Sequence, residues 1–361
     1  MNHYDTNLDK NNANYVPLKR NIPAPIAEPI MDEIRYIDGL QADASIKRYY
    51  PQHHLASQVI GYVDQNNSGQ FSIESQFNAD LQGSKGRVAY NRSASGKLTR
   101  AMTVDQPIIS QGNSIELTLD IELQSILQSE LKKSVIRTNA KTANGIILNP
   151  HTGEILAMAT YPDFDPNEYQ KFPIDSYKNR AIADAYEPGS TYKIINTAAA
   201  LESGVITVLD TFFCENGNYK LPRGKIVHDH EPHEEMSVED IFIHSSNIGI
   251  TKAVDKLGAK HIYEFARKFG FGIKTGVSLP GESSGKLRNY TTWSRLSGPS
   301  VSMGQEISIN TLQLALAYSA AANGGYLLSP RIIKNISGDD FGGHVFSPRP
   351  IRQVMSKETS K

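Results

Sequence analysis

The sequence predicts a mixed α/β (α+β) chain with a β-rich domain over residues 1–110 and a second domain of helices and sheet over residues 111–361. A chain of 361 residues is long enough for two domains, each with its own core. Short apolar runs separated by turn residues dominate the first part, whereas a hairpin and several amphipathic helices dominate the second.

Composition and charge exclude several classes of protein. A formal net charge of −1, without any Arg/Lys-rich block, gives no basis for nucleic-acid binding. The single cysteine, Cys214, excludes an intrachain disulfide but does not fix the compartment. No stretch approaches the ~18–20 apolar residues of a membrane span, and no signal peptide opens the chain. We therefore expect any anchor or targeting segment to lie outside this chain, and about the first 15 residues to be disordered.

The first domain is expected to be irregular and extended. Residues 56–63, "ASQVIGYV", and 69–77, "GQFSIESQF", are short apolar runs that favour strands. Residues 65–69, "QNNSG", and 81–88, "LQGSKGRV", are typical of turns. A domain boundary is expected near residues 111–113, where "QGNSIELTLD" begins a strand.

The second domain opens with a helix and a hairpin. Asp120 resembles an N-cap with Glu122 in the first turn, and apolar residues then recur every four positions, at Leu123, Leu127, Leu131 and Val135. Two apolar runs, 145–148 and 155–159, flank the turn "NPHTG" and predict a β-hairpin.

Helical patterns follow the hairpin. A helix over "STYKIINTAAALES" is expected to end at Gly204, and Ser237 is expected to cap a helix over "SVEDIFIH". Further helices are predicted over residues 247–258, 260–270 and 308–325. The tail to Lys361 is weakly patterned.

A serine and a lysine in the segment "AYEPGSTYKIINT" suggest nucleophilic catalysis. The preceding Pro-Gly turn places Ser190 at a helix N-terminus, where free backbone N–H groups favour a developing oxyanion. Lys193, three residues later, shares its face and can act as a base if burial keeps it neutral. The alternative is a serine cap before a solvated lysine. Ser129 and Lys132 have the same S-x-x-K spacing without a turn signal.

A second motif, "HSSNIG", places Ser245 and Asn247 between two predicted helices. The serine can relay a proton and the asparagine amide can hold a substrate amide, although a simple polar turn is the alternative. S-x-x-K at a helix start followed by S-x-N in a later loop is a signature of serine acyltransferases.

Blocks along most of the chain resemble class B penicillin-binding proteins, which are peptidoglycan transpeptidases. "RYYP", "ASQVIGYV" and "SIESQFNADLQGSKG" resemble their non-catalytic pedestal, or dimerisation-type, domain. "NPHTGEILAMATYPDFDPN", "EPGSTYK", "HSSNIG", "FGFGIKTGVSLPGE" and "SMGQEISINTLQLALAYSAAANGG" resemble successive blocks of the catalytic domain, which has the serine β-lactamase-like fold. The short spacing between the domains resembles the division-type members.

The resemblance implies roles for four residues. Ser190 would be the acylated nucleophile, Lys193 its base, Ser245 a proton relay and Asn247 a ligand of the substrate amide. It also implies that D-Ala-D-Ala stem peptides are cross-linked, that β-lactams acylate the serine, and that no cofactor or metal is used. A glycosyltransferase and other divisome proteins would be partners, on the outer face of the cytoplasmic membrane.

A third family element, K-T-G on a strand of the cleft, is expected to lie beyond this chain. The literal "KTG" at residues 274–276 follows Asn247 too closely and lies in a block that resembles a family loop. The sequence therefore resembles a family member truncated at both ends. We expect impaired activity, because the missing strand would carry one oxyanion donor, worth about 10²–10³-fold in rate.

Two other function classes stay open. The cluster "HDHEPHEE", with His228, His230 and His233 beside two glutamates, could bind zinc in a metallohydrolase, although a polar loop is the simpler interpretation. A non-catalytic penicillin-binding scaffold or sensor is the other alternative. The resemblance further suggests an ion pair between Arg48 and Glu74, against two separate surface charges.

Overall fold

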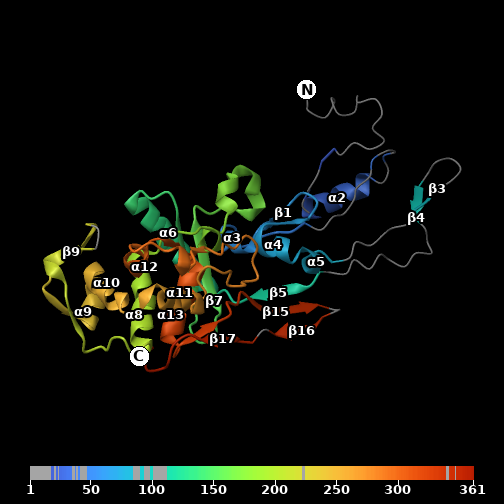
Figure 1. The fold of residues 1–361 in the computed structure, drawn as a ribbon. Helices are drawn as coiled ribbons and strands as arrows, with labels where there is room; N and C mark the ends of the chain where they lie inside the picture. The colour runs from blue at the N-terminus through green and yellow to red at the C-terminus, as the bar shows by residue number, and fades with distance from the viewer. Residues whose placement is uncertain are drawn as a thin grey trace. The chain divides into compact units, whose positions relative to one another are not determined.

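The computed structural model describes residues 18–19, 22, 24–34, 37, 40, 47–83, 90–92, 98–100, 112–221, 224–338, 341–345 and 347–361 (Figure 1). The chain divides into two units, Met1–Tyr49 and Tyr50–Lys361. The first unit contains helix α2, Ala24–Ile34. The predicted disordered start and most of the predicted turn 81–88 lie outside the described residues. Among the described helices, none is both long and apolar enough to cross a membrane.

Residues 50–83 contain more helix than the sequence predicts. Strands β1 (Tyr62–Val63) and β2 (Gly69–Gln70) form a small antiparallel hairpin around the predicted turn. The predicted extended runs are otherwise short helices, which are α3 Ser57–Ile60, α4 Ser72–Gln76 and α5 Asn78–Leu81. Helices of four or five residues are too short to show a 3.6-residue period, so their apolar residues look like strands in the sequence. Strands β3 (Tyr90–Arg92) and β4 (Leu98–Arg100) pair with each other.

An aromatic cluster joins residues 50–83 to residues 161–177. Tyr50, Tyr62, Phe164 and Tyr177 are buried together, and the ring of Tyr62 stacks on Tyr169 at 4.1 Å between centroids. These two segments therefore pack within one unit of the fold, and the expected boundary near residues 111–113 stays a prediction.

The buried Glu74 lies next to this cluster. The hydroxyl of Tyr50 donates to its carboxylate at 3.2 Å. The ion pair between Glu74 and Arg48 stays a prediction.

The predicted helix and hairpin form the first layers of the larger unit. Helix α6 (Ile121–Thr138) follows strand β5 (Ser114–Leu117), and the carboxylate of its N-cap, Asp120, accepts from two backbone N–H groups at 3.0 and 2.9 Å. Strands β6 (Ala143–Leu148) and β7 (Ile155–Tyr161) pair antiparallel. Both α6 and α13 (Thr311–Ala322) pack against this hairpin (Figure 1).

The helical part follows the sequence prediction closely. Ser237 and Asp240 form the predicted capping box of α9, and Asn310 forms a second one with Gln313 at α13. The other helices are α7 Arg180–Ala183, α8 Lys193–Glu202, α9 Val238–Ile243, α10 Asn247–Asp255, α11 Gly258–Lys268 and α12 Ser297–Ser302. The 3-10 segments are η1 Pro166–Lys171, η2 Ile174–Tyr177, η3 Gly189–Tyr192, η4 Glu215–Gly217 and η5 Tyr290–Thr292.

Short strand pairs connect these helices. They are β8 Thr211–Phe213 with β11 Glu235–Ser237, β9 Asn218–Lys220 with β10 Ile226–His228, and β12 Lys286–Leu287 with β13 Ile307–Ser308. Cys214, after β8, is fully buried, as expected of a small apolar side chain.

The tail is more regular than the sequence indicates. Strand β15 (Ile333–Gly338) lies between β5 and β16 (Phe341–Val345), while β14 (Tyr326–Leu328) pairs with β17 (Pro350–Gln353). The weak pattern did not predict these strands, because β15 is stabilised by pairing with a segment more than two hundred residues earlier in the chain.

Candidate functional site

Ser190 lies in the first turn of a continuous helical segment. Its turn, η3, leads directly into α8, and Gly189 has a positive φ of 57° at the point where the chain enters it. The Ser190 side chain is exposed. Backbone N–H groups in a first turn have no acceptor within the helix, so the position suits a developing negative charge.

Two later segments brace this turn. The N–H of Gly189 donates to the carbonyl of Gly304 at 3.1 Å, and the Tyr318 hydroxyl donates to the Thr191 carbonyl at 2.9 Å. A Cβ on Gly304, whose φ is 74°, would lie only 2.1 Å from the Gly189 oxygen. The glycine of "SMGQE" is therefore required for the close approach that fixes the Ser190 turn.

Lys193 is buried, with a relative exposure of 3%. Its Nζ donates to the Ser245 carbonyl at 2.5 Å, to Ser245 Oγ at 3.0 Å and to Asn247 Oδ1 at 2.8 Å. Burial lowers the pKa of Lys193 to about 8, although the negative charge of Asp229 acts in the opposite direction. At pH 7 about a tenth of Lys193 is therefore neutral, far more than for an ordinary lysine, and the neutral form is the one that a general base requires.

The S-x-N motif forms the turn between α9 and α10. Ser245 has a left-handed φ of 55°, and Asn247 begins α10. Ser246 caps α10 by accepting from the Gly249 N–H at 2.9 Å. Strained backbone at a non-glycine residue often marks a functional site. The structure thus brings Lys193, Ser245 and Asn247 together, with Lys193 one helical turn after Ser190 in the chain, whereas no hydrogen bond among the described residues joins the Ser190 side chain to this group.

Asp229 is a site residue that the sequence did not reveal. Its carboxylate accepts from Ser246 Oγ at 2.6 Å and from the backbone N–H groups of Asn247 and Ile248 at 2.5 and 3.1 Å. The side-chain amide of Asn247 donates to the carbonyl of His228 at 2.8 Å. The segment after β10 therefore holds the S-x-N turn in place. An aspartate among histidines carries no local signal of this role.

The surroundings of two other motifs show that neither lies at this site. Ser129 and Lys132 are exposed in the middle of α6. The "KTG" at 274–276 lies in a loop, as expected, where the N–H groups of Thr275 and Gly276 donate to Glu282 at 2.7 and 3.3 Å.

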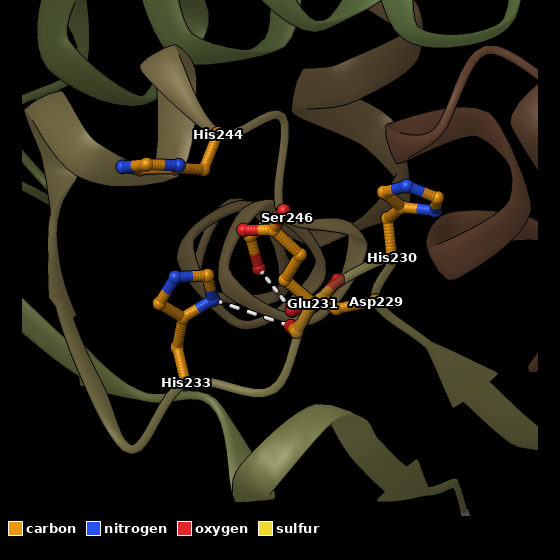
Figure 2. A pocket seen from close by; sticks show the side chains of 6 residues that line it. All are labelled: Asp229, His230, Glu231, His233, His244 and Ser246. Carbon is orange, nitrogen blue, oxygen red and sulfur yellow. Dashed lines mark hydrogen bonds between the residues drawn. The ribbon is translucent and has the colours of Figure 1, made fainter.

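The histidines of "HDHEPHEE", which the sequence leaves open as a metal site, do not all lie together. A ring nitrogen of His228 is paired with Asn218 Oδ1 at 2.9 Å. A cavity of about 120 Å³ is lined by Asp229, His230, Glu231, His233, His244 and Ser246 (Figure 2). His233 lies near His244, a histidine at the end of α9 that the sequence did not suggest as part of this cluster.

Two family models match the chain. Residues 144–361 match the penicillin-binding protein transpeptidase domain, and residues 2–117 match the penicillin-binding protein dimerisation domain.

Individual proteins are similar over most of the chain. Penicillin-binding protein PbpB of Mycolicibacterium smegmatis is 33% identical over 98% of this chain and 54% of its own. A probable peptidoglycan D,D-transpeptidase, PbpC of Pseudomonas aeruginosa, is 33% identical over 83% of this chain and 53% of its own. The crystal structure of penicillin-binding protein 3 from Mycobacterium tuberculosis in complex with aztreonam has a TM-score of 0.76 and 31% identity over 87% of this chain and 66% of its own. The chain spans about half the length of the relatives PbpB and PbpC.

Proposed function

The chain belongs to the penicillin-binding protein transpeptidase family, and we propose on that basis that it carries the acyl-transfer site of a peptidoglycan D,D-transpeptidase. The observation that supports this most is the buried Lys193, bonded to Ser245 and Asn247 one turn after an exposed serine. We propose residues 111–361 as the transpeptidase domain and residues 1–110 as the pedestal domain.

The proposed reaction begins with a proton transfer. Neutral Lys193 accepts the proton of Ser190 Oγ as that oxygen attacks the carbonyl of the penultimate D-alanine of a stem peptide. The C–N bond to the terminal D-alanine then breaks, and its nitrogen receives a proton through Ser245. The amine of a second stem attacks the resulting ester and loses a proton to Lys193; the bond to Ser190 Oγ then breaks, Oγ regains that proton, and the cross-link is formed.

The contacts of Lys193 are consistent with both of its protonation states. An ammonium group has three donors, and three acceptors surround this one. When Lys193 is neutral, Ser245 can rotate its hydroxyl and donate to Nζ, which is the contact that a proton relay needs. The Asn247 amide gives one N–H to His228 and has a second N–H for the substrate.

The finer assignments follow from the resemblance. We propose that the whole protein works on the outer face of the cytoplasmic membrane, in cell division, with a glycosyltransferase and other divisome proteins. A β-lactam would acylate Ser190 as a substrate analogue.

The test is the intact mass of the chain after incubation with a β-lactam. We expect one drug mass on the wild-type chain, none on Ser190→Ala, and one on the matched control Ser129→Ala. A folded wild-type chain that gains no mass would instead favour the alternative, a non-catalytic scaffold. Addition to Ser190→Ala would contradict the assignment of the nucleophile.

A further inference from the structure

Three potential metal ligands from two segments meet beside the S-x-N turn. Glu231 and His233 come from the loop after β10, and His244 ends α9. One ligand atom from each residue lies within 4.8 Å of the others. Figure 2 shows His233 and His244 on the same side of the cavity, whereas His230 lies on the opposite side.

The ring of His233 leaves one nitrogen available for a metal, and the ring of His244 lies close to it. Nδ1 of His233 lies 3.2 Å from the backbone carbonyl of Glu231, a contact that favours the tautomer protonated at Nδ1 and leaves Nε2 free to bind a metal. The ring centroids of His233 and His244 are 5.2 Å apart. Glu231 and His244 are exposed and His233 is half-buried, so rotation of their side chains costs little packing.

The donor set indicates which metal would bind. Two imidazoles and a carboxylate are typical ligands of zinc, which accepts four ligands in a tetrahedral arrangement at about 2.0–2.2 Å. Ligand atoms in such a site are about 3.4 Å apart, by the same bond lengths. The observed separations thus have to shrink by little more than an ångström. We propose that Glu231, His233 and His244 bind one zinc ion, with water as the fourth ligand.

Zinc at this site would join the two segments that define the S-x-N turn. His244 directly precedes Ser245, and Glu231 follows Asp229 by two residues, with Asp229 bonded to the backbone of Asn247. A bound ion would therefore stabilise the conformation of the S-x-N turn and the position of Asp229. Zinc binding itself does not rest on the proposed acyl transfer, so its test measures metal affinity and not acylation.

The experiment titrates zinc into the untagged full chain in competition with a chromophoric chelator. We expect one equivalent to bind, and each of His233→Gln and His244→Gln to weaken binding at least about tenfold. The matched control is His230→Gln, which removes an imidazole that lines the same cavity but points away from the other two, and it should leave the affinity unchanged.

The proposal is overturned if the wild-type chain binds no zinc, or if both variants bind it as tightly as the His230→Gln control. Circular dichroism of each variant without metal shows whether that variant is folded. If one variant is unfolded, the zinc affinity of the other variant decides the test. Magnesium should not compete with zinc, because this hard cation prefers oxygen ligands.

Discussion

Two of the S-x-x-K sequences in this chain, at residues 129–132 and 190–193, have different surroundings. Ser129 and Lys132 lie in the middle of α6, where both side chains are exposed and every backbone N–H can bond within the helix. Ser190 is in a first turn, and Lys193 is buried against Ser245 and Asn247. The spacing is identical, so the proposed difference in chemistry comes from the position in the helix and from the residues that approach from elsewhere in the chain.

The largest expected difference is between the two lysines. Lys193→Ala should lower the rate of β-lactam acylation by about 10²–10⁴-fold, the usual contribution of a general base. Lys132→Ala should leave the rate unchanged. Stopped-flow or mass-spectrometric acylation kinetics measure both, and equal rates for the two variants would remove the basis for distinguishing the sites.

Removal of the Ser245 hydroxyl, the proposed proton relay, should have a smaller effect. Ser245→Ala keeps the backbone carbonyl that accepts from Lys193 but removes the Oγ contact at 3.0 Å. We expect acylation to slow by about 10²-fold, at the low end for proton transfer. An unchanged rate would mean that Ser245 contributes only to the conformation of the turn and not to proton transfer.

Asp229 is a further difference between the surroundings of Lys193 and those of Lys132, because its negative charge raises the pKa of Lys193. Asp229→Asn should shift the pH midpoint of acylation to lower pH. It should also reduce the free energy of unfolding by about 1.5–3 kcal/mol, because hydrogen bonds to a charged group are weakened. Denaturant unfolding and a pH series measure the two effects, with the exposed Asp255→Asn as the control. A midpoint that moves upward would contradict the assigned electrostatics.

The smallest effect is expected at the exposed serine. Ser129→Ala should change the free energy of unfolding by no more than about 0.5 kcal/mol, as at most surface positions. Acylation should proceed at the wild-type rate. A marked loss of acylation in this variant would show that the exposed copy takes part in the chemistry.

The sequence predicted the elements whose signals are local. Helix α6, the β6–β7 hairpin and the capping box at Ser237 were all predicted, because periodicity, turn residues and caps lie within a few residues of each other. Strand β15 was missed, because its partner is distant in the sequence.

The same distinction applies to the site. Ser190, Lys193, Ser245 and Asn247 lie in motifs, so sequence reasoning could name them, and their catalytic roles stay predictions. Asp229 was missed because its three partners belong to the next loop and helix. His244 was missed as a possible metal ligand because folding, not spacing, brings it near His233.

The most direct test of the contrast is the rate of β-lactam acylation as a function of pH, for the wild-type chain and Lys132→Ala. Because the neutral form of Lys193 is the proposed base, both rates should rise with pH and level off above the Lys193 pKa of about 8. A midpoint near the ordinary lysine value of about 10.4, or a curve altered by Lys132→Ala, would contradict the proposal that burial makes Lys193 the base.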